Sequence, residues 1–413
     1  MKFQAIFVTI ISIICFHSVE AQESFEVEYL KRDVYFLASE EMEGRGTGTK
    51  GEAMAADYLA ASFKMLSLTP VGVDNSYIMP FDFKYSTKMH GSEESDLIST
   101  TGKNVAGFLD NGAEYTIVIG AHYDHLAKGE FGSSRAPNLF GRIHFGADDN
   151  ASGTSGVLAL ANYYVKNDKK EAFNILFVCF SGEELGLHGS KKFVERLPVA
   201  KEKINYMVNM DMIGRMKPDS KTLVVTGIGS AKEWDSLLIA NNKDFALVKD
   251  SSGIGASDHS SFYLAGIPVL NFFTGQHSDY HTPGDTPDKI NYEGQSDILK
   301  YITRIVSGTE QIAKLNYVQT VNKGSDTPRF KVTMGVMPDY TWQDGGLRLD
   351  GVTVDKPAAN AGLKAGDIVL QIGDSKVDNI QDYMKVLGKH EKGDKVKVKI
   401  KREGKEMLLD LQF

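Results

Sequence analysis

The apolar residues between positions 23 and 315 follow two patterns. In some segments they recur at helical spacing: 27–39, 49–66, 154–166, 190–196, 231–240 and 296–315. In others they form short, nearly continuous runs: 104–109, 115–120, 173–180, 204–210, 222–227 and 268–273. Continuous apolar runs are typical of strands buried on both faces, and helical segments separate many of them. The pattern predicts an α/β fold in which a mixed, mostly parallel sheet is covered by helices on both faces.

A polar stretch at 317–329 interrupts this pattern, because hydrophobic periodicity is absent there. Beyond it lie short β-type runs and one helical segment: 330–337, 346–354, 367–372, 395–400 and 380–387. This last part is long enough to form a small domain of its own. We therefore expect a first domain at 22–316, a linker at 317–329 and a small β-rich domain at 330–413.

The first 21 residues have the composition of a secretory signal. Lys2 precedes an apolar stretch at 3–16, and Val19 and Ala21 form a small-x-small site before Gln22. The alternative, a membrane anchor, is disfavoured because the stretch is shorter than the ~20 residues that cross a bilayer. We predict cleavage after Ala21, an exported protein that is periplasmic or secreted, and no stable membrane span in the mature chain.

Composition changes this picture in two ways. The 46 Lys and Arg residues are outnumbered by 54 Asp and Glu, which gives a net charge of -8, and no long basic run is present. A phosphate-binding surface is therefore not expected, and nucleic acid is excluded as a partner. Of the two cysteines, only Cys179 remains after signal cleavage, so the mature chain cannot form an internal disulfide.

Imidazole and carboxylate side chains follow the predicted strands, at the edge where open α/β sheets bind their ligands. These residues are His122 and Asp124, Glu183 and Glu184, Asp211, and His281, and Asp148 and Asp149 join them just before the predicted helix at 154–166. Any one of these segments would also suit an ordinary turn. Their recurrence at successive strand ends instead indicates a site for Zn²⁺, which takes His and Asp/Glu ligands. The set is larger than one metal ion needs.

The order of these motifs resembles that of the M28 family of zinc metallopeptidases, most of which are aminopeptidases. The resemblance is carried by Ala121-His122-Tyr123-Asp124, Gly146-Ala147-Asp148-Asp149-Asn150, Ser181-Gly182-Glu183-Glu184, Asn209-Met210-Asp211 and Tyr280-His281-Thr282-Pro283. It implies a zinc exopeptidase fold with two zinc ions per chain. His122 and Asp211 would hold one zinc ion, Glu184 and His281 the other, and Asp148 would bridge them. Glu183 would be the general base that takes a proton from water.

The same resemblance implies roles for neighbouring residues. Asp124 would accept a hydrogen bond that orients His122. The peptide bond between Asp148 and Asp149 would be cis, and Asp149 would support the site without binding metal. Tyr280 would either help to stabilise the tetrahedral intermediate or act as a packed aromatic ring. No role is assigned to Asp258 and His259, and His125 and His144 are expected to be loop or hydrogen-bonding residues.

The C-terminal segment resembles a PDZ domain of the type found in bacterial proteases. The resemblance is carried by Met334-Gly335-Val336, Gly346–Val352 and Ala358–Val369. A PDZ groove binds an extended peptide by strand addition and captures its terminal carboxylate on backbone N–H groups, here around Met334, Gly335 and Val336. The alternative is a packing module with an empty groove.

Together these features predict an exported dinuclear zinc aminopeptidase that removes residues from the free amino end of peptides. One alternative is a glutaminyl cyclase of the same fold, which works with a single zinc ion. The presence of both His122 and Asp211 argues against it. The other alternative is a non-catalytic peptide-binding protein, which would be expected to have lost ligand positions, and none is lost here.

Overall fold

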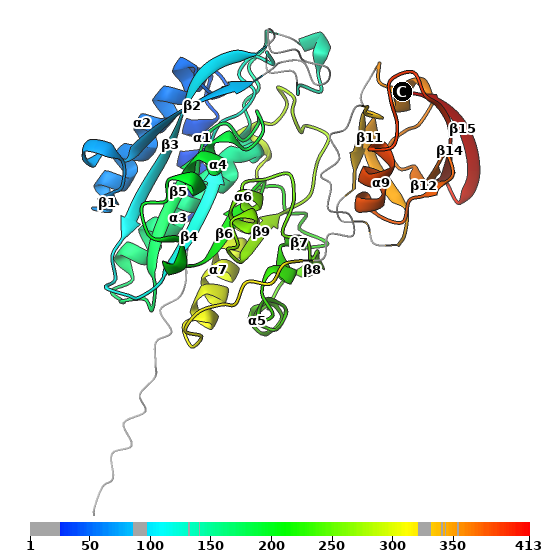
Figure 1. Cartoon of the computed structure of the whole chain (residues 1–413). Helices are drawn as coiled ribbons and strands as arrows, with labels where there is room; N and C mark the ends of the chain where they lie inside the picture. Colours follow the sequence, from blue (N-terminus) through cyan, green and yellow to red (C-terminus); the bar gives the residue numbers. More distant parts are fainter. Residues whose placement is uncertain are drawn as a thin grey trace, which may run out of the picture.

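The computed structural model describes residues 25–85, 97–130, 133–139, 141–320, 332–339, 342, 344–352 and 355–413. The predicted signal segment at 1–21 and most of the predicted linker lie outside these ranges. The strands form two separate sheets, a nine-stranded one before the linker and a six-stranded one after it (Figure 1). Among the helices that the structure describes, none combines the length and the apolar composition that a membrane crossing requires.

The first sheet has the order β1-β3-β5-β4-β6-β9-β7-β8, and β2 pairs with β3. Its strands are β1 (Thr69–Pro70), β2 (Ile78–Tyr85), β3 (Ile98–Leu109), β4 (Thr116–His122), β5 (Asn174–Phe180), β6 (Ile204–Met210), β7 (Thr222–Thr226), β8 (Ala246–Lys249) and β9 (Val269–Phe273). The central strands β5, β4, β6 and β9 are parallel neighbours, whereas β1, β2 and β3 pair antiparallel. The prediction of a mixed α/β sheet is confirmed, with parallel pairing at its centre.

Helices cover both faces of this sheet, as predicted. They are α1 (Val27–Leu37), α2 (Lys50–Met65), α3 (Gly153–Lys166), α4 (His188–Glu195), α5 (Trp234–Asn241), α6 (His259–Leu264) and α7 (Tyr292–Thr309). Helices α1, α2, α3, α5 and α7 contribute to one apolar cluster, and α4 and α6 contribute to another. Strands β4, β5 and β6 are buried along their whole length between these clusters, which explains their uninterrupted apolar sequences.

The second sheet belongs to the β-rich domain and has the order β10-β11-β12-β14-β15, with β13 paired to β12. Its strands are β10 (Val336–Pro338), β11 (Leu347–Val352), β12 (Ile368–Ile372), β13 (Ser375–Lys376), β14 (Lys395–Arg402) and β15 (Lys405–Gln412), with helices α8 (Pro357–Asn360) and α9 (Ile380–Leu387). A separate apolar cluster forms its core, with Met334, Val369 and Ile400 among its buried members. This domain therefore has its own core.

The first residues of the predicted linker pack on the first domain. Tyr317 forms a β-bridge with Ala231, and the Val318 N–H donates to the Ser230 carbonyl oxygen at 2.8 Å. Thr320 Oγ1 lies 2.8 Å from the hydroxyl of Tyr263, near the end of α6. Three residues at the start of the predicted linker therefore contact the first domain.

Candidate metal centre

The candidate site lies where the carboxyl ends of β4, β5 and β6 meet. His122 is the last residue of β4, Glu183 and Glu184 follow β5, and Asp211 directly follows β6. Since β4 pairs in parallel with both β5 and β6, these three strand ends face the same edge of the sheet. The sequence-predicted ligands from these strands are thus brought together.

Two groups of potential ligand atoms form at this edge. In the first, His122 Nε2 lies 3.3 Å from Asp211 Oδ1, and the ligand atoms of His122, Glu183 and Asp211 all lie within 4.8 Å of one another. The second consists of His125, Asp149 and Glu184, whose ligand atoms also lie within 4.8 Å of one another, and His281 Nε2 lies 3.2 Å from Glu184 Oε2. The predicted division, with His122 and Asp211 on one side and Glu184 and His281 on the other, matches these distances.

The carboxylate between the two groups is Asp149, and the prediction of Asp148 for this position is wrong. Asp149 Oδ1 lies 3.4 Å from His122 Nε2, and its Oδ2 lies 3.2 Å from His281 Nε2. Asp148 points elsewhere: its Oδ1 accepts from the Gly214 N–H at 2.7 Å, and its Oδ2 lies 3.2 Å from His277 Nε2. The cis peptide bond is likewise one residue further on, between Asp149 and Asn150.

Asp285 holds the backbone of this turn. Its Oδ2 accepts hydrogen bonds from the N–H groups of both Asp148 and Asp149, at 2.9 and 3.0 Å. Because both N–H groups are held by one carboxylate, the turn has a fixed path, and its two side chains project in different directions. Asp285 lies close to the predicted ligand His281 in the sequence, but the sequence alone did not assign it this role.

The donor set fits zinc. His122 Nδ1 lies 3.2 Å from the Asp124 carbonyl oxygen, and His281 Nδ1 lies 3.0 Å from the Ser133 carbonyl oxygen. A carbonyl oxygen only accepts, so each Nδ1 carries the proton, and in a neutral ring each Nε2 presents a lone pair. Both lone pairs face carboxylate oxygens, an arrangement that a metal ion or a proton between them would satisfy. Carbonyl-bound histidines are the usual form of a zinc-binding histidine.

The electrostatics agree with this fit. Burial alone lowers the pKa of His122, but the charges of Asp211 and Glu183 outweigh it and raise that pKa well above its usual value. The pKa of His281 behaves in the same way because of Glu184 and Asp149. Without a metal ion, protons would therefore occupy the two Nε2 positions, so protons and metal ions compete for the site.

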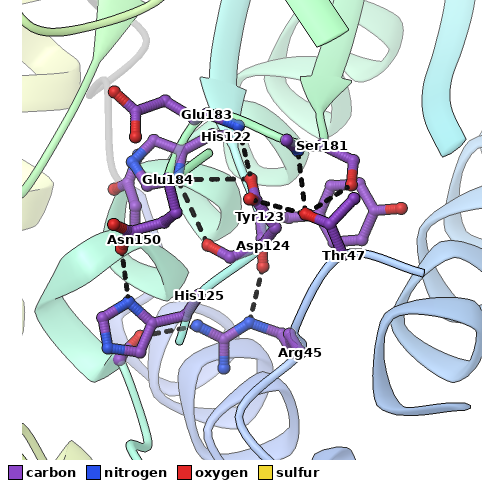
Figure 2. A network of polar contacts seen from close by, with 12 residues as sticks. Arg45, Thr47, His122, Tyr123, Asp124, His125, Asn150, Ser181, Glu183 and Glu184 are labelled. Atoms are coloured by element: carbon purple, nitrogen blue, oxygen red, sulfur yellow. Dashed lines mark hydrogen bonds and ion pairs between the residues drawn. The ribbon is translucent and has the colours of Figure 1, made fainter. Parts of the chain in front are cut away.

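Glu183 is the predicted general base, and its side chain lies beside His122 and Asp211. Burial raises the pKa of Glu183 well above its usual value, and the carboxylates of Glu184 and Asp211 act in the same direction. Its backbone N–H donates to Asp124 Oδ1 at 3.2 Å, which fixes the start of its side chain (Figure 2).

Asp124 supports the site in a different way from the one predicted. Its carboxylate lies 3.7 Å from His122 Nδ1, whereas its backbone carbonyl oxygen lies 3.2 Å away. The carboxylate instead accepts from the Glu183 N–H and, at 2.9 Å, from the Thr47 hydroxyl (Figure 2). Asp124 therefore joins His122, the segment that carries Glu183, and Thr47, which precedes α2.

Arg45 is a central residue of the site that sequence reasoning missed. Its guanidinium is completely buried and donates to the backbone carbonyl oxygens of Tyr123, Phe145 and Gly146 at 2.6, 2.8 and 2.8 Å. It thus joins the end of β4 to the turn that leads to Asp149. Burial lowers its pKa to about 10, so it remains charged at neutral pH and offsets part of the carboxylate charge. The only signal for Arg45 in the sequence is its position between Gly44 and Gly46.

Replacing Arg45 with Met is expected to lower the free energy of unfolding of the zinc-free protein by about 3–5 kcal/mol, because buried carbonyls and carboxylates lose their cation. Denaturant unfolding of both proteins measures the difference. Arg196→Met, at an exposed arginine, is the control and should change stability by less than about 0.5 kcal/mol. A loss below about 1 kcal/mol for Arg45→Met would show that the guanidinium is dispensable.

The remaining predicted residues lie as follows. The Tyr280 ring stacks on the His281 ring, with centroids 3.8 Å apart. Asp258 and His259 are buried at the start of α6, and burial raises the pKa of Asp258 to about 7.

In the β-rich domain Met334 is buried, Gly335 has a positive φ of 70°, and Val336 begins β10, the edge strand of its sheet.

Comparison with known proteins supplies the family. The family model described as Peptidase family M28 matches residues 104–306, and the PDZ domain model matches residues 331–413. Aminopeptidase YwaD of Bacillus subtilis is 32% identical over 192 residues, which cover 43% of this chain and 40% of the relative. The alkaline phosphatase isozyme conversion protein of Escherichia coli is 32% identical over 261 residues, which cover 59% of this chain and 73% of the relative.

Solved structures show the same fold at lower identity. The aminopeptidase from Aneurinibacillus sp. strain AM-1 matches with a TM-score of 0.54 and 19% identity, over 74% of this chain and 97% of the other. The glutaminyl cyclase of Bacteroides thetaiotaomicron matches with a TM-score of 0.55 and 16% identity, over 69% of this chain and 98% of the other. The fold alone therefore does not separate these two activities.

The matches to curated aminopeptidases are partial, because the chain spans 40%, 55% and 64% of the length of three of them. The Escherichia coli relative is covered over 73% of its length, and the family model matches the segment that contains every proposed metal ligand. The chain therefore belongs to peptidase family M28, and a PDZ domain follows its peptidase domain.

Proposed function

We propose that this chain is an exported dinuclear zinc aminopeptidase that acts on peptides with a free amino end. The observation that supports it most is the position of Asp149, whose two carboxylate oxygens face His122 on one side and His281 on the other. One carboxylate shared by two ligand groups suits two metal ions held close together. Export is supported by the composition of residues 1–21.

Zinc in this site would act as a Lewis acid toward the scissile carbonyl group and toward a water molecule. Glu183 would take the proton from that water and later give it to the leaving amine, since its carboxylate lies beside His122 and Asp211. Asp124 would keep Glu183 in place through its backbone N–H. His122 and His281 would remain in one tautomer through their carbonyl partners.

The preference for an aminopeptidase over a carboxypeptidase is supported by the relatives. Those from Bacillus subtilis and Arthroderma otae are named aminopeptidase and probable leucine aminopeptidase.

Metal content and substrate choice test the proposal together. We expect two zinc ions per chain after full loading, measured by elemental analysis. We also expect cleavage of fluorogenic aminoacyl substrates whose amino end is free, measured by release of the fluorophore. The same substrates with an acetylated amino end are the matched control and should not be cleaved. One zinc ion per chain together with cyclisation of an amino-terminal glutamine would instead identify a glutaminyl cyclase, the activity of a protein with the same fold.

The PDZ domain is proposed to bind the carboxyl end of longer peptides. Strand β10 ends its sheet in the described part of the domain and pairs there with β11, so its other side is available for strand addition. Gly335 and Val336 lie at the start of this strand, where a terminal carboxylate would be captured on N–H groups.

Truncation after Ser325 is expected to leave cleavage of dipeptide substrates unchanged, because Thr320 keeps its contact with Tyr263 and the cut lies beyond it. For long peptides we expect KM to rise by about tenfold or more, since a tethered second site raises the effective concentration of substrate. Steady-state kinetics on both substrate classes measure this.

Long peptides with an amidated carboxyl end are the matched control for the truncation. They lack the carboxylate that the groove would bind, so their KM should be the same in the full-length and truncated proteins. Equal loss of activity on dipeptides and long peptides would show that the domain supports the peptidase domain structurally, and recruitment would be abandoned.

A further inference from the structure

His125 lies directly beside the second ligand group, although the sequence predicted only a loop or hydrogen-bonding residue there. Its Nδ1 is 2.8 Å from Glu184 Oε1, and its ring is fully buried. We propose that His125 is a positioning residue for Glu184: its Nδ1–H holds one carboxylate oxygen so that the other faces the metal position. This inference rests on the proposed dinuclear site.

The two oxygens of Glu184 have separate partners. Oε1 lies 2.8 Å from His125 Nδ1, whereas Oε2 lies 3.2 Å from His281 Nε2. An ionised carboxylate only accepts hydrogen bonds, so the proton of the His125 ring must be on Nδ1. One N–H on Nδ1 is enough to make this donation.

The ring of His125 is fixed by its surroundings. Gly146 has a φ of 58°, and a Cβ atom added there would lie 2.5 Å from His125 Cγ, so only glycine leaves room for the ring. The His281 ring contacts it edge-on, with centroids 5.9 Å apart. The backbone N–H of His125 donates to the Arg45 carbonyl oxygen at 3.3 Å. The Arg45 guanidinium in turn donates to the Gly146 carbonyl oxygen.

Glu184 needs such a partner because its side chain is long and because the residue lies in the loop after β5. Without a donor on Oε1, the carboxylate could rotate away from His281, and binding a metal ion would then cost the loss of that rotamer freedom. The Nδ1–H of His125 removes this freedom in advance. Outer hydrogen-bond partners of metal ligands typically contribute 10–100-fold in metal affinity.

Two variants at His125 separate its hydrogen bond from its volume. His125→Leu removes the donor, and we expect the affinity of the second metal position to fall 10–100-fold. His125→Asn keeps a side-chain N–H close to the position of Nδ1, and we expect affinity within about threefold of the unmodified protein, since the donor to Glu184 is retained. If the His125 ring acted only by filling space, the smaller asparagine would not restore the metal affinity.

His144→Asn is the matched control, because His144 is also fully buried in the same part of the fold. Its partners are the Ser134 hydroxyl and the Arg142 carbonyl oxygen, and neither is a proposed metal ligand. Metal affinity should therefore not change. Denaturant unfolding of each zinc-free protein shows whether all variants are folded before the titrations are compared.

The experiment is a titration of the metal-free, full-length protein with Co²⁺, followed by visible absorption and calibrated by a competing chelator. The inference is supported if the unmodified protein binds two ions, His125→Leu binds the second ion more weakly, and His125→Asn regains that affinity. If His125→Leu binds the second ion with unchanged affinity, the inference is overturned and the proposed function stays intact. Equal losses in both His125 variants, or a loss in the His144 control, also overturn it. Fewer than two ions in the unmodified protein would refute the proposed function itself.

Discussion

Asp149→Asn is expected to reduce bound zinc from two ions per chain to one or none and to lower turnover more than about 100-fold, beyond the range for outer partners of metal ligands. The reason is that Asp149 faces both histidines, with Oδ1 3.4 Å from His122 Nε2 and Oδ2 3.2 Å from His281 Nε2. An amide has one carbonyl oxygen and no negative charge, so it cannot serve both positions. Elemental analysis and kinetics on an aminoacyl substrate measure the two effects.

Asp148→Asn is the matched control at the preceding residue. The asparagine Oδ1 can still accept from the Gly214 N–H, and its amide can donate to His277, so zinc content should stay at two ions per chain. If Asp148→Asn lost zinc and Asp149→Asn kept it, the prediction from the motif would be right, and the orientation of this turn would be wrong.

Glu183→Gln is expected to lower kcat by about 10²–10⁴-fold, the range typical for loss of a general base, while both zinc ions remain bound. Glutamine has nearly the same shape and keeps the backbone bond to Asp124, but it cannot accept a proton from water. Turnover and zinc content must be measured on the same preparation, because only their combination defines the role.

Glu184→Gln is the control for the neighbouring position and should weaken the second metal ion, since Glu184 Oε2 lies 3.2 Å from His281 Nε2. A Glu183→Gln protein that lost zinc would make Glu183 a ligand of the first position, where its carboxylate already lies near His122 and Asp211. Near-normal turnover would show that another group accepts the proton.

The central part of the fold could be predicted because its strands are buried on both faces. Strand β4 is buried at every position, and a short apolar run of this kind between helical segments indicates a central strand of a covered sheet. Strand β2 was not predicted, because its buried and exposed residues mix with Pro80 and Lys84. Its place is decided by pairing with β3, a contact that its own sequence does not encode.

The site could be predicted only to the level of its motifs. Two consecutive aspartates have the same chemistry, so the choice between Asp148 and Asp149 depends on the path of the backbone, which Asp285 holds from far along the chain. Arg45 and His125 were missed for a related reason. Their partners are backbone carbonyl oxygens of distant segments and one carboxylate, and a carbonyl oxygen leaves no signature in the sequence.

The shared carboxylate of Asp149 also determines how the proposed enzyme would respond to zinc supply. Its two oxygens belong to different metal positions, so the positions form one unit and should not fill independently. If activity requires both ions, the active fraction at low zinc varies with the square of the free zinc concentration. A protein exported into dilute surroundings would then lose activity more steeply, as zinc becomes scarce, than an enzyme that needs a single ion.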